Sequence, residues 1–229
     1  MTAHYKLADI GTDHAYIPIY LTQQKKITEA VALDVNEGPL QRAEEHIREN
    51  GLEAEIETRL SNGFQALQPG EVQSAVIAGM GGGLVIRILT EGAEVVRKLE
   101  ECILQPQSEI EKVRAFLLEK GYEFLEEDMV CEDGKYYPMM RVEHGSMKLP
   151  AKGELEYGNP ALQRSIGVWS AYLRAEQGKT DVILKTLVDN GQEKSDRYVE
   201  LLDKRSRMVD MLNRIPAGCG QEMKEYEMQ

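Results

Sequence analysis

The sequence predicts an α/β fold with a mostly parallel sheet, a terminal antiparallel hairpin and a C-terminal helical module. Through the first two thirds of the chain, short apolar runs alternate with longer amphipathic stretches. An Asp-Gly pair, Asp133-Gly134, then separates two strand-like runs. Beyond Gly158 the apolar residues follow helical spacing.

Buried strands are expected at the short apolar runs, and helices where the spacing becomes amphipathic. We expect helix 38–50 to begin with Pro39 in its first turn and to end before Gly51. A glycine-rich loop is expected at 79–83, ahead of a helix over 84–89. The expected strands are 5–10, 30–35, 54–60, 74–78 and 102–105, and the remaining helices are 16–24 and 110–120.

The direction of the final strand of the sheet distinguishes two classes of fold. Segments 122–131 and 135–143 predict a hairpin, and so a reversed final strand. Dinucleotide-binding folds close with parallel strands, whereas Rossmann-like class I methyltransferases end with an antiparallel strand. The hairpin therefore favours the methyltransferase class.

A loop-rich stretch over 145–158 indicates a domain boundary. We expect an α/β domain over 1–150 and a helical, coiled-coil domain over 158–216. Trp169 and Leu173 lie on one apolar helix face, Arg205 interrupts the stripe of the next helix, and Asn190-Gly191 is the expected turn. The tail after Pro216 is expected to be frayed.

Composition excludes several classes of protein. The 229 residues are 42% hydrophobic, which is enough for a core, and no apolar run reaches the length of a membrane span. The N-terminus carries no signal-peptide pattern. The cysteines (Cys102, Cys131 and Cys219) and the four histidines lack metal-ligand spacing, so we expect no metal and a cytoplasmic setting. The oligomeric state is not fixed, and a monomer is compatible with the sequence.

The acidic charge is unusual for a protein that binds nucleic acid. The net charge is −12, with 16 basic and 28 acidic residues before Tyr157 and 11 of each from there on. Within the neutral C-terminal part, Arg197, Lys204, Arg205 and Arg207 are either phosphate contacts or a solvated helix face.

The first candidate site follows the first strand, at Asp9-Ile10-Gly11-Thr12-Asp13-His14. A turn there, opening onto a helix, points backbone N–H groups at a ligand. One glycine and two acids replace the G-x-G-x-x-G pattern that seats a pyrophosphate. Acidic residues suit a cationic methyl donor, while a dinucleotide site and a structural turn stay open as alternatives.

Three further constellations follow later strands. Asp34 ends the second strand, where a carboxylate binds ribose hydroxyls of either cofactor, and Asn36 lies in the same loop. Asn62-Gly63 follows the third strand and is a candidate for reading an adenine edge, with Phe64 either stacking on the ring or lying in the core. Ala78-Gly79-Met80 opens the glycine-rich segment, which lacks the Lys-Ser/Thr of a phosphate-binding loop.

All four constellations fall at the carboxyl ends of successive strands. Ligands bind at this edge in open α/β sheets, so the coincidence is a stronger indication than any one motif.

Four segments together resemble the bacterial tRNA (adenine(22)-N1)-methyltransferase (TrmK-like) family. They are DIGTDHAYIP from Asp9, D-x-N-x-G-P from Asp34, AGMGGGL from Ala78 and LQPQ from Leu104. The resemblance covers nearly the whole chain and implies S-adenosylmethionine as cofactor, tRNA as partner and methylation of N1 of adenine 22. The implied donor-binding residues are Asp9, Gly11, Asp13, His14, Asp34, Asn36, Asn62, Gly63, Gly79 and Met80, and Thr12, Val35 and Ala78 complete the predicted site.

Asp13 and His14 are the predicted catalytic residues. The Asp13 carboxylate is placed to stabilise positive charge on the methylated base or to hold the donor's amino group, and His14 to shape the pocket. Family members usually begin with a helical segment ahead of the first strand, whereas here that strand starts almost at Met1. The alternatives are a methyltransferase for another substrate, a nicotinamide-dependent oxidoreductase and a degenerate, RNA-binding methyltransferase-like module.

Overall fold

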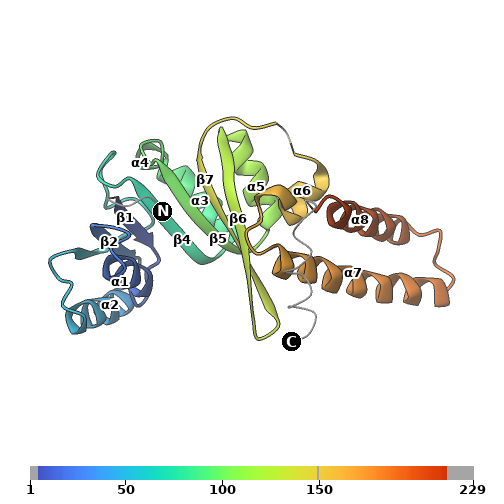
Figure 1. Ribbon diagram of the computed structural model, residues 1–229, viewed down its shortest axis with the longest axis horizontal. Helices are drawn as coiled ribbons and strands as arrows, with labels where there is room; N and C mark the ends of the chain where they lie inside the picture. Colours follow the sequence, from blue (N-terminus) through green and yellow to red (C-terminus); the bar gives the residue numbers. More distant parts are fainter. Residues whose placement is uncertain (1–4, 149, 216–229) are drawn as a thin grey trace. The chain divides into compact units, whose positions relative to one another are not determined.

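The computed structural model describes residues 5–148 and 150–215. Cys219 and the tail after Pro216 lie outside the described residues. The elements in chain order are β1 (Lys6–Ile10), α1 (Tyr16–Gln23), β2 (Glu29–Asp34), α2 (Glu37–Glu49), β3 (Ile56–Leu60), β4 (Ser74–Gly81), α3 (Gly82–Glu91), α4 (Ala93–Val96), β5 (Glu101–Ser108), α5 (Ile110–Glu119), β6 (Tyr122–Glu132), β7 (Lys135–His144), α6 (Lys152–Tyr157), the 3-10 helix η1 (Pro160–Leu162), α7 (Ile166–Asp189) and α8 (Asp196–Asn213) (Figure 1).

The chain forms two compact units. Among the described residues, the first unit contains 5–125 and 139–147, and the second contains 126–138, 148 and 150–215. The expected domains, 1–150 and 158–216, are each continuous in sequence, whereas in the structure residues 126–138 belong to the second unit and residues 139–147 return to the first. The tip of the β6–β7 hairpin belongs with the helical unit because Met129 packs in the core of that unit.

The predicted sheet is present, with seven strands in the order β3-β2-β1-β4-β5-β7-β6. Strands β1 to β5 pair in parallel, and Asp9 of β1 lies between Ala32 of β2 and Val76 of β4. Strand β7 is antiparallel to β5, with Cys102 opposite Val142. The reversed strand expected from the hairpin signal is therefore confirmed.

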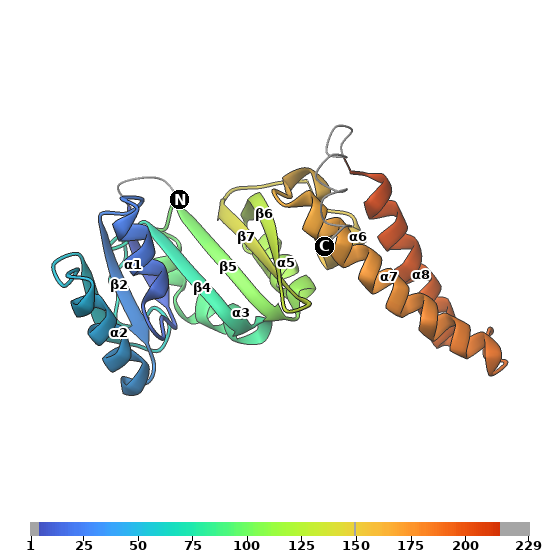
Figure 2. The same cartoon turned by 60° about the horizontal axis from the view of Figure 1, so that its bottom comes forward.

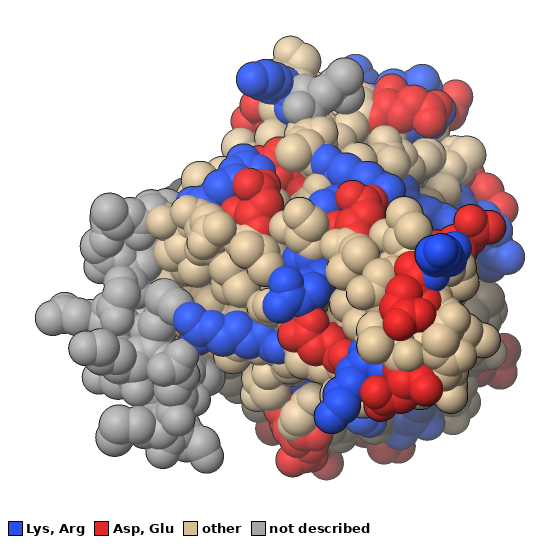
Figure 3. Space-filling view, turned by 90° about the vertical axis from the view of Figure 1, so that its right-hand side faces the viewer, with Lys and Arg blue, Asp and Glu red and all other residues tan. Residues whose placement is uncertain are grey.

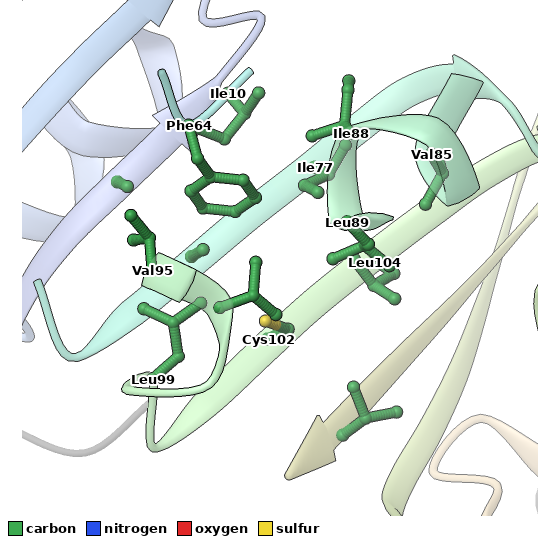
Figure 4. Close-up of a cluster of buried hydrophobic side chains, with 14 of the residues drawn as sticks. Ile10, Phe64, Ile77, Val85, Ile88, Leu89, Val95, Leu99, Cys102 and Leu104 are labelled. Atoms are coloured by element: carbon green, nitrogen blue, oxygen red, sulfur yellow. The ribbon is translucent and has the colours of Figure 1, made fainter. Parts of the chain in front are cut away.

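Helices cover both faces of the parallel strands in the first unit (Figure 2). Helices α1 and α2 pack on one face, where Ile19 and Ile47 meet Leu7 and Ala32. Helices α3 and α5 pack on the other face, where Val85 and the other side chains of Figure 4 surround Ile10, Ile77 and Leu104. Phe64 is 2% exposed in this second cluster, so it is a core residue and does not stack on a ligand.

The second unit has its own core around Trp169, which is fully buried. Met129 from the hairpin tip and Met208 from α8 pack in the same cluster. The Trp169 indole Nε1 donates a 2.7 Å hydrogen bond to the carbonyl of Tyr157. Helices α7 and α8 form the expected helical hairpin, and the turn includes Gly191 at φ 67°. Coiled-coil geometry stays a prediction.

The structure corrects the expected glycine loop. Residues 79–81 continue β4, and α3 begins at Gly82 without an intervening loop. The strand pairs with β5 through Met80 and Pro106, with shifts of register on either side. A β-carbon on Gly82 would overlap the carbonyl oxygen of Ser108, so the glycine serves close backbone packing between strand and helix.

Two short helices were not expected. Helix α4 follows α3 directly, and α6 lies inside the stretch predicted to be loop. The backbone N–H of Ala151 donates to Glu154 at 2.8 Å, which stabilises the first turn of α6. Within the described part of the chain, no helix combines the length and apolarity needed to cross a membrane.

Candidate functional site

The loop between β1 and α1 is tied to the end of β2. The backbone N–H groups of Gly11 and Thr12 both donate to the Leu33 carbonyl, at 2.7 and 2.9 Å. Asp13 and Ala15 adopt left-handed backbone angles, with φ of 50° and 57°. Each such residue costs about 1 kcal/mol or more and persists where the surroundings impose it, as they do at ligand-binding loops.

Asp9 is a buried acid at the base of this loop. Its carboxylate accepts a 2.7 Å hydrogen bond from the Thr12 hydroxyl, and the residue is 3% exposed. Burial raises the pKa of Asp9 to about 6, the Thr12 hydrogen bond opposes the shift, and the nearby Asp34 carboxylate adds to it. Two acids close together with one hydroxyl donor favour a cationic ligand and disfavour a pyrophosphate.

Asp34 ends β2 beside a pocket. Its Oδ1 accepts a 2.9 Å hydrogen bond from the backbone N–H of Asn36, while its Oδ2 has no protein donor among the described residues. The adjacent pocket has a volume of about 360 Å³ and lies at the ends of β2 and β3. It is lined by Val35, Leu60, Ser61, Asn62, Gln65 and Ala66. The exposed apolar side chains of Val35 and Leu60 beside a carboxylate fit a flat base attached to a ribose.

Gly11 and Gly79 form the part of the site between β1 and β4. Gly11 has φ 76°, and a β-carbon there would overlap the Cε of Met80, so the Met80 side chain lies across the glycine. The backbone N–H of Gly79 donates to Gln105 Oε1 at 2.8 Å. The structure thus brings the β1 and β4 constellations together, and it adds Gln105 from β5.

Asp13 and His14 lie at the outer side of the loop. The Asp13 carboxylate is more than half exposed and forms a 2.8 Å ion pair with Arg42 of α2. His14 is half-buried, its Nε2 lies 3.5 Å from Asp13, and its buried Nδ1 has no partner among the described residues. The two predicted catalytic side chains are therefore neighbours, and the Asp13 carboxylate also pairs with the Arg42 guanidinium.

Sequence reasoning missed several members of this edge. Leu60 and Gln65 line the pocket, Arg42 pairs with Asp13, and Gln105 binds the Gly79 backbone. Leu60 was visible as the last residue of an expected strand. The contact of Arg42 depends on how α1 and α2 lie side by side, which no local pattern contains.

The basic residues of α8 are paired with acids inside the second unit. Arg205 Nε lies 2.5 Å from Asp181, and Lys204 Nζ lies 3.9 Å from Glu176. Arg207 pairs with Glu156 at 2.7 Å, and Arg197 with Glu200 at 2.9 Å. Basic and acidic side chains are interspersed on the face shown in Figure 3. These pairs favour the structural reading of the cluster, because a neutralised cation attracts phosphate weakly.

Among the described residues, no three His, Cys, Asp or Glu side chains lie close enough together to bind a metal ion. The two cysteines in the same residues, Cys102 and Cys131, are free.

Residues 1–140 match the family model of the methyltransferase domain. The tRNA (adenine(22)-N(1))-methyltransferase of Bacillus subtilis (strain 168) is 35% identical over 139 residues, which are 61% of this chain. The match spans 58% of that relative, so the chain aligns with less than two thirds of its length.

Two solved structures resemble nearly the whole chain. A Streptococcus pneumoniae protein in complex with S-adenosyl-L-methionine is 32% identical, with a TM-score of 0.80 over 92% of this chain and 94% of its own. The Bacillus subtilis m1A22 tRNA methyltransferase TrmK is 26% identical, with a TM-score of 0.77 over 92% of this chain and 93% of its own. The similarity thus includes the C-terminal helices.

Proposed function

Because this chain belongs to the methyltransferase domain family, we propose that it transfers the methyl group of S-adenosylmethionine to N1 of adenine 22 in tRNA. One observation carries the proposal: the buried, Thr12-bonded Asp9 lies beside Asp34 at the strand edge where the loop residues converge. The substrate is taken from the Bacillus subtilis relatives, which are named for this reaction. A cytoplasmic setting follows from a tRNA substrate.

The residues of the site fit this donor. Asp34 has a carboxylate oxygen available for the ribose, and the neighbouring pocket of about 360 Å³ offers Val35 and Leu60 to an adenine ring. Asp9 supplies negative charge for the cationic end, and Gly11 allows close approach of the backbone. Asn36, Gly63, Ala78 and Met80 remain members of the proposed site, as does Asn62, which lines the pocket.

The protein's contribution to the chemistry is positioning and charge. When bound, S-adenosylmethionine supplies a methyl group on a positively charged sulfur, and the lone pair of adenine N1 accepts it without a base. The Asp13 carboxylate stabilises the positive charge that the base acquires, and His14, held against Asp13, forms the adjoining wall. The target N1 takes part in base pairing within the folded tRNA, so the base must leave that pair before it can react.

The competing functions make different binding predictions. A nicotinamide-dependent enzyme binds NAD, a methyltransferase binds S-adenosylmethionine and S-adenosylhomocysteine, and a degenerate RNA-binding module binds none of them. A ligand that binds only the folded chain raises its melting temperature. A thermal-shift series with the three compounds therefore separates these classes.

The decisive experiment measures methyl transfer from labelled S-adenosylmethionine to two tRNA transcripts. One carries adenine at position 22 and the other carries guanine there. We expect label only in the first transcript. Label in both would overturn the proposed position, and donor binding without label in either would point to another substrate.

A further inference from the structure

Three aromatic rings stack together at the start of α1 and on the neighbouring face of α2. The centroids of His14 and Tyr16 lie 5.1 Å apart, and that of His46 lies 5.2 Å from each of them. The ring planes differ by 10° to 22°. Near-parallel rings at this spacing form an offset stack, so the three side chains present one aromatic surface, which we call the ring platform.

Polar contacts hold the ring platform in place. The His46 Nδ1 lies 3.1 Å from the carbonyl oxygen of His14, which fixes the His46 ring against the β1–α1 loop. Asp13 lies 3.5 Å from His14 Nε2 and 2.8 Å from Arg42, so the loop is also tied to α2. A flat ligand that meets a preorganised surface loses less conformational entropy on binding than one that orders mobile side chains.

The ring platform is open to solvent at Tyr16. The Tyr16 residue is 64% exposed although its ring contacts two histidines. It is the first residue of α1, directly after the loop that carries Asp13 and His14. An exposed aromatic ring therefore adjoins the predicted catalytic pair in the same compact unit.

We propose that the ring platform stacks an unpaired base of the RNA substrate, with the exposed ring of Tyr16 as the contact. This inference rests on the proposed function, since it assigns a surface to the RNA of that reaction. Proteins that bind unpaired nucleotides stack bases on aromatic side chains, and the contact tolerates any base because every base has a π face. The paired cations of α8 leave the aromatic surface beside the loop as the better-supported RNA contact.

Tyr20 provides a matched control for Tyr16. It lies one turn further along α1, is 57% exposed, and has no ring contact among the described residues. Tyr16→Ala and Tyr20→Ala therefore remove the same side chain from the same helix at similar exposure. Only the first removes part of the ring platform. Tyr16→Phe keeps the ring and removes the hydroxyl.

The test measures affinity of the full chain for an unmodified tRNA transcript in the presence of S-adenosylhomocysteine. We expect Tyr16→Ala to weaken tRNA binding on the order of tenfold, the typical effect of losing one stacked base. Tyr16→Phe and Tyr20→Ala should stay within about twofold, since neither removes a stacking ring. Affinity for S-adenosylhomocysteine alone should be unchanged in all three variants.

Fluorescence identifies the stacked base. Transcripts carry 2-aminopurine at position 22 or at an adjacent nucleotide, and stacking on Tyr16 quenches its emission. The quench should appear with the wild type and Tyr16→Phe and be lost with Tyr16→Ala. Equal tRNA affinities of Tyr16→Ala and Tyr20→Ala, or equal losses in Tyr16→Phe and Tyr16→Ala, would overturn the proposal.

The two proposals fail separately. A wild type that methylates adenine 22 while Tyr16→Ala binds tRNA normally disproves only the stacking surface. A wild type that binds and quenches but transfers no methyl group disproves only the proposed reaction.

Discussion

The guanidinium of Arg42 lies 2.8 Å from the carboxylate of Asp13, so a residue of α2 shares the acid that we expect to face the methylated base. Because both side chains are substantially exposed, the pair contributes little to folding. Its consequence is functional, since an acid engaged by a cation offers less negative charge to a third group.

This pairing gives opposite predictions for its two members. Asp13→Asn should lower the turnover of methyl transfer by roughly tenfold, because the positively charged product loses a stabilising carboxylate. Arg42→Gln should leave turnover unchanged or raise it, because Asp13 is released. Single-turnover rates with saturating donor measure both effects. A loss of donor affinity in Asp13→Asn with normal turnover would assign Asp13 to the donor's amino group instead.

The pKa of Asp9 predicts how donor binding depends on pH. In the free chain this pKa is raised to about 6, so Asp9 is protonated below that value. A cationic donor favours the ionised form, and binding at lower pH must release the proton. We expect the Kd for S-adenosylmethionine to rise as pH falls below about 6, by at most about tenfold per pH unit. Calorimetry between about pH 5 and 8 checks this, and Asp9→Asn should have a flat profile.

The same group affects stability with a defined sign. The folded pKa of about 6 exceeds the ordinary 3.8, so the folded chain holds the proton more tightly than the unfolded chain. The contribution is present below about pH 4 and is lost as pH rises through 6, at a cost on the order of 3 kcal/mol. At neutral pH without donor, Asp9→Asn should therefore raise the free energy of unfolding. Denaturant titration measures it, and a lower value for the variant would contradict the assignment.

Alanine substitutions at Gly11 and Gly51 distinguish the effect of backbone strain from that of steric overlap. Gly11→Ala and Gly51→Ala both place alanine at positive φ, 76° and 66°, but only at Gly11 does the new β-carbon meet Met80. Both should lose about 1 kcal/mol of stability through strain. We expect only Gly11→Ala to weaken S-adenosylmethionine binding, by roughly tenfold or more, because its backbone approaches the ligand. Equal donor affinities in the two variants would remove Gly11 from the site.

Trp169 tests the core of the second unit. It is fully buried and hydrogen-bonded to Tyr157, so Trp169→Ala should cost about 3–5 kcal/mol. Val182→Ala, on the same helix at 67% exposure, should stay within about 0.5 kcal/mol. Thermal unfolding followed by circular dichroism compares them. A small loss in Trp169→Ala would mean that the cluster contributes little to the stability of this unit.

Local sequence patterns predicted most of the strands and helices of the first unit. Buried runs such as that over Ala30–Leu33 fix strands, and Gly51 at φ 66° ends α2 as its position predicts. The constellations at Asp9 and Asp34 meet because parallel strands share one edge, which topology guarantees once the strands are known.

The features that the sequence did not predict depend on contacts between segments that are distant in the chain. The glycines at 79–81 look like a loop, yet pairing with β5 keeps them in the strand. Arg42 and His46 reach the β1–α1 loop only because α2 lies beside α1. The stacking of His46 on His14 and Tyr16 could not be predicted for the same reason, since His46 is distant from both in the chain.

The hairpin tip has a consequence for the order in which the chain is made. Glu127 accepts hydrogen bonds from the Asn159 backbone and the Gln163 side chain, both at 2.8 Å, and Tyr136 packs against Tyr172 at 5.2 Å between ring centroids. During synthesis the tip emerges from the ribosome before these partners. Residues 126–138 therefore lack the donors to Glu127 and the ring contact of Tyr136 until α7 has been translated, and in a chain stalled before that point the hairpin would be exposed to proteases.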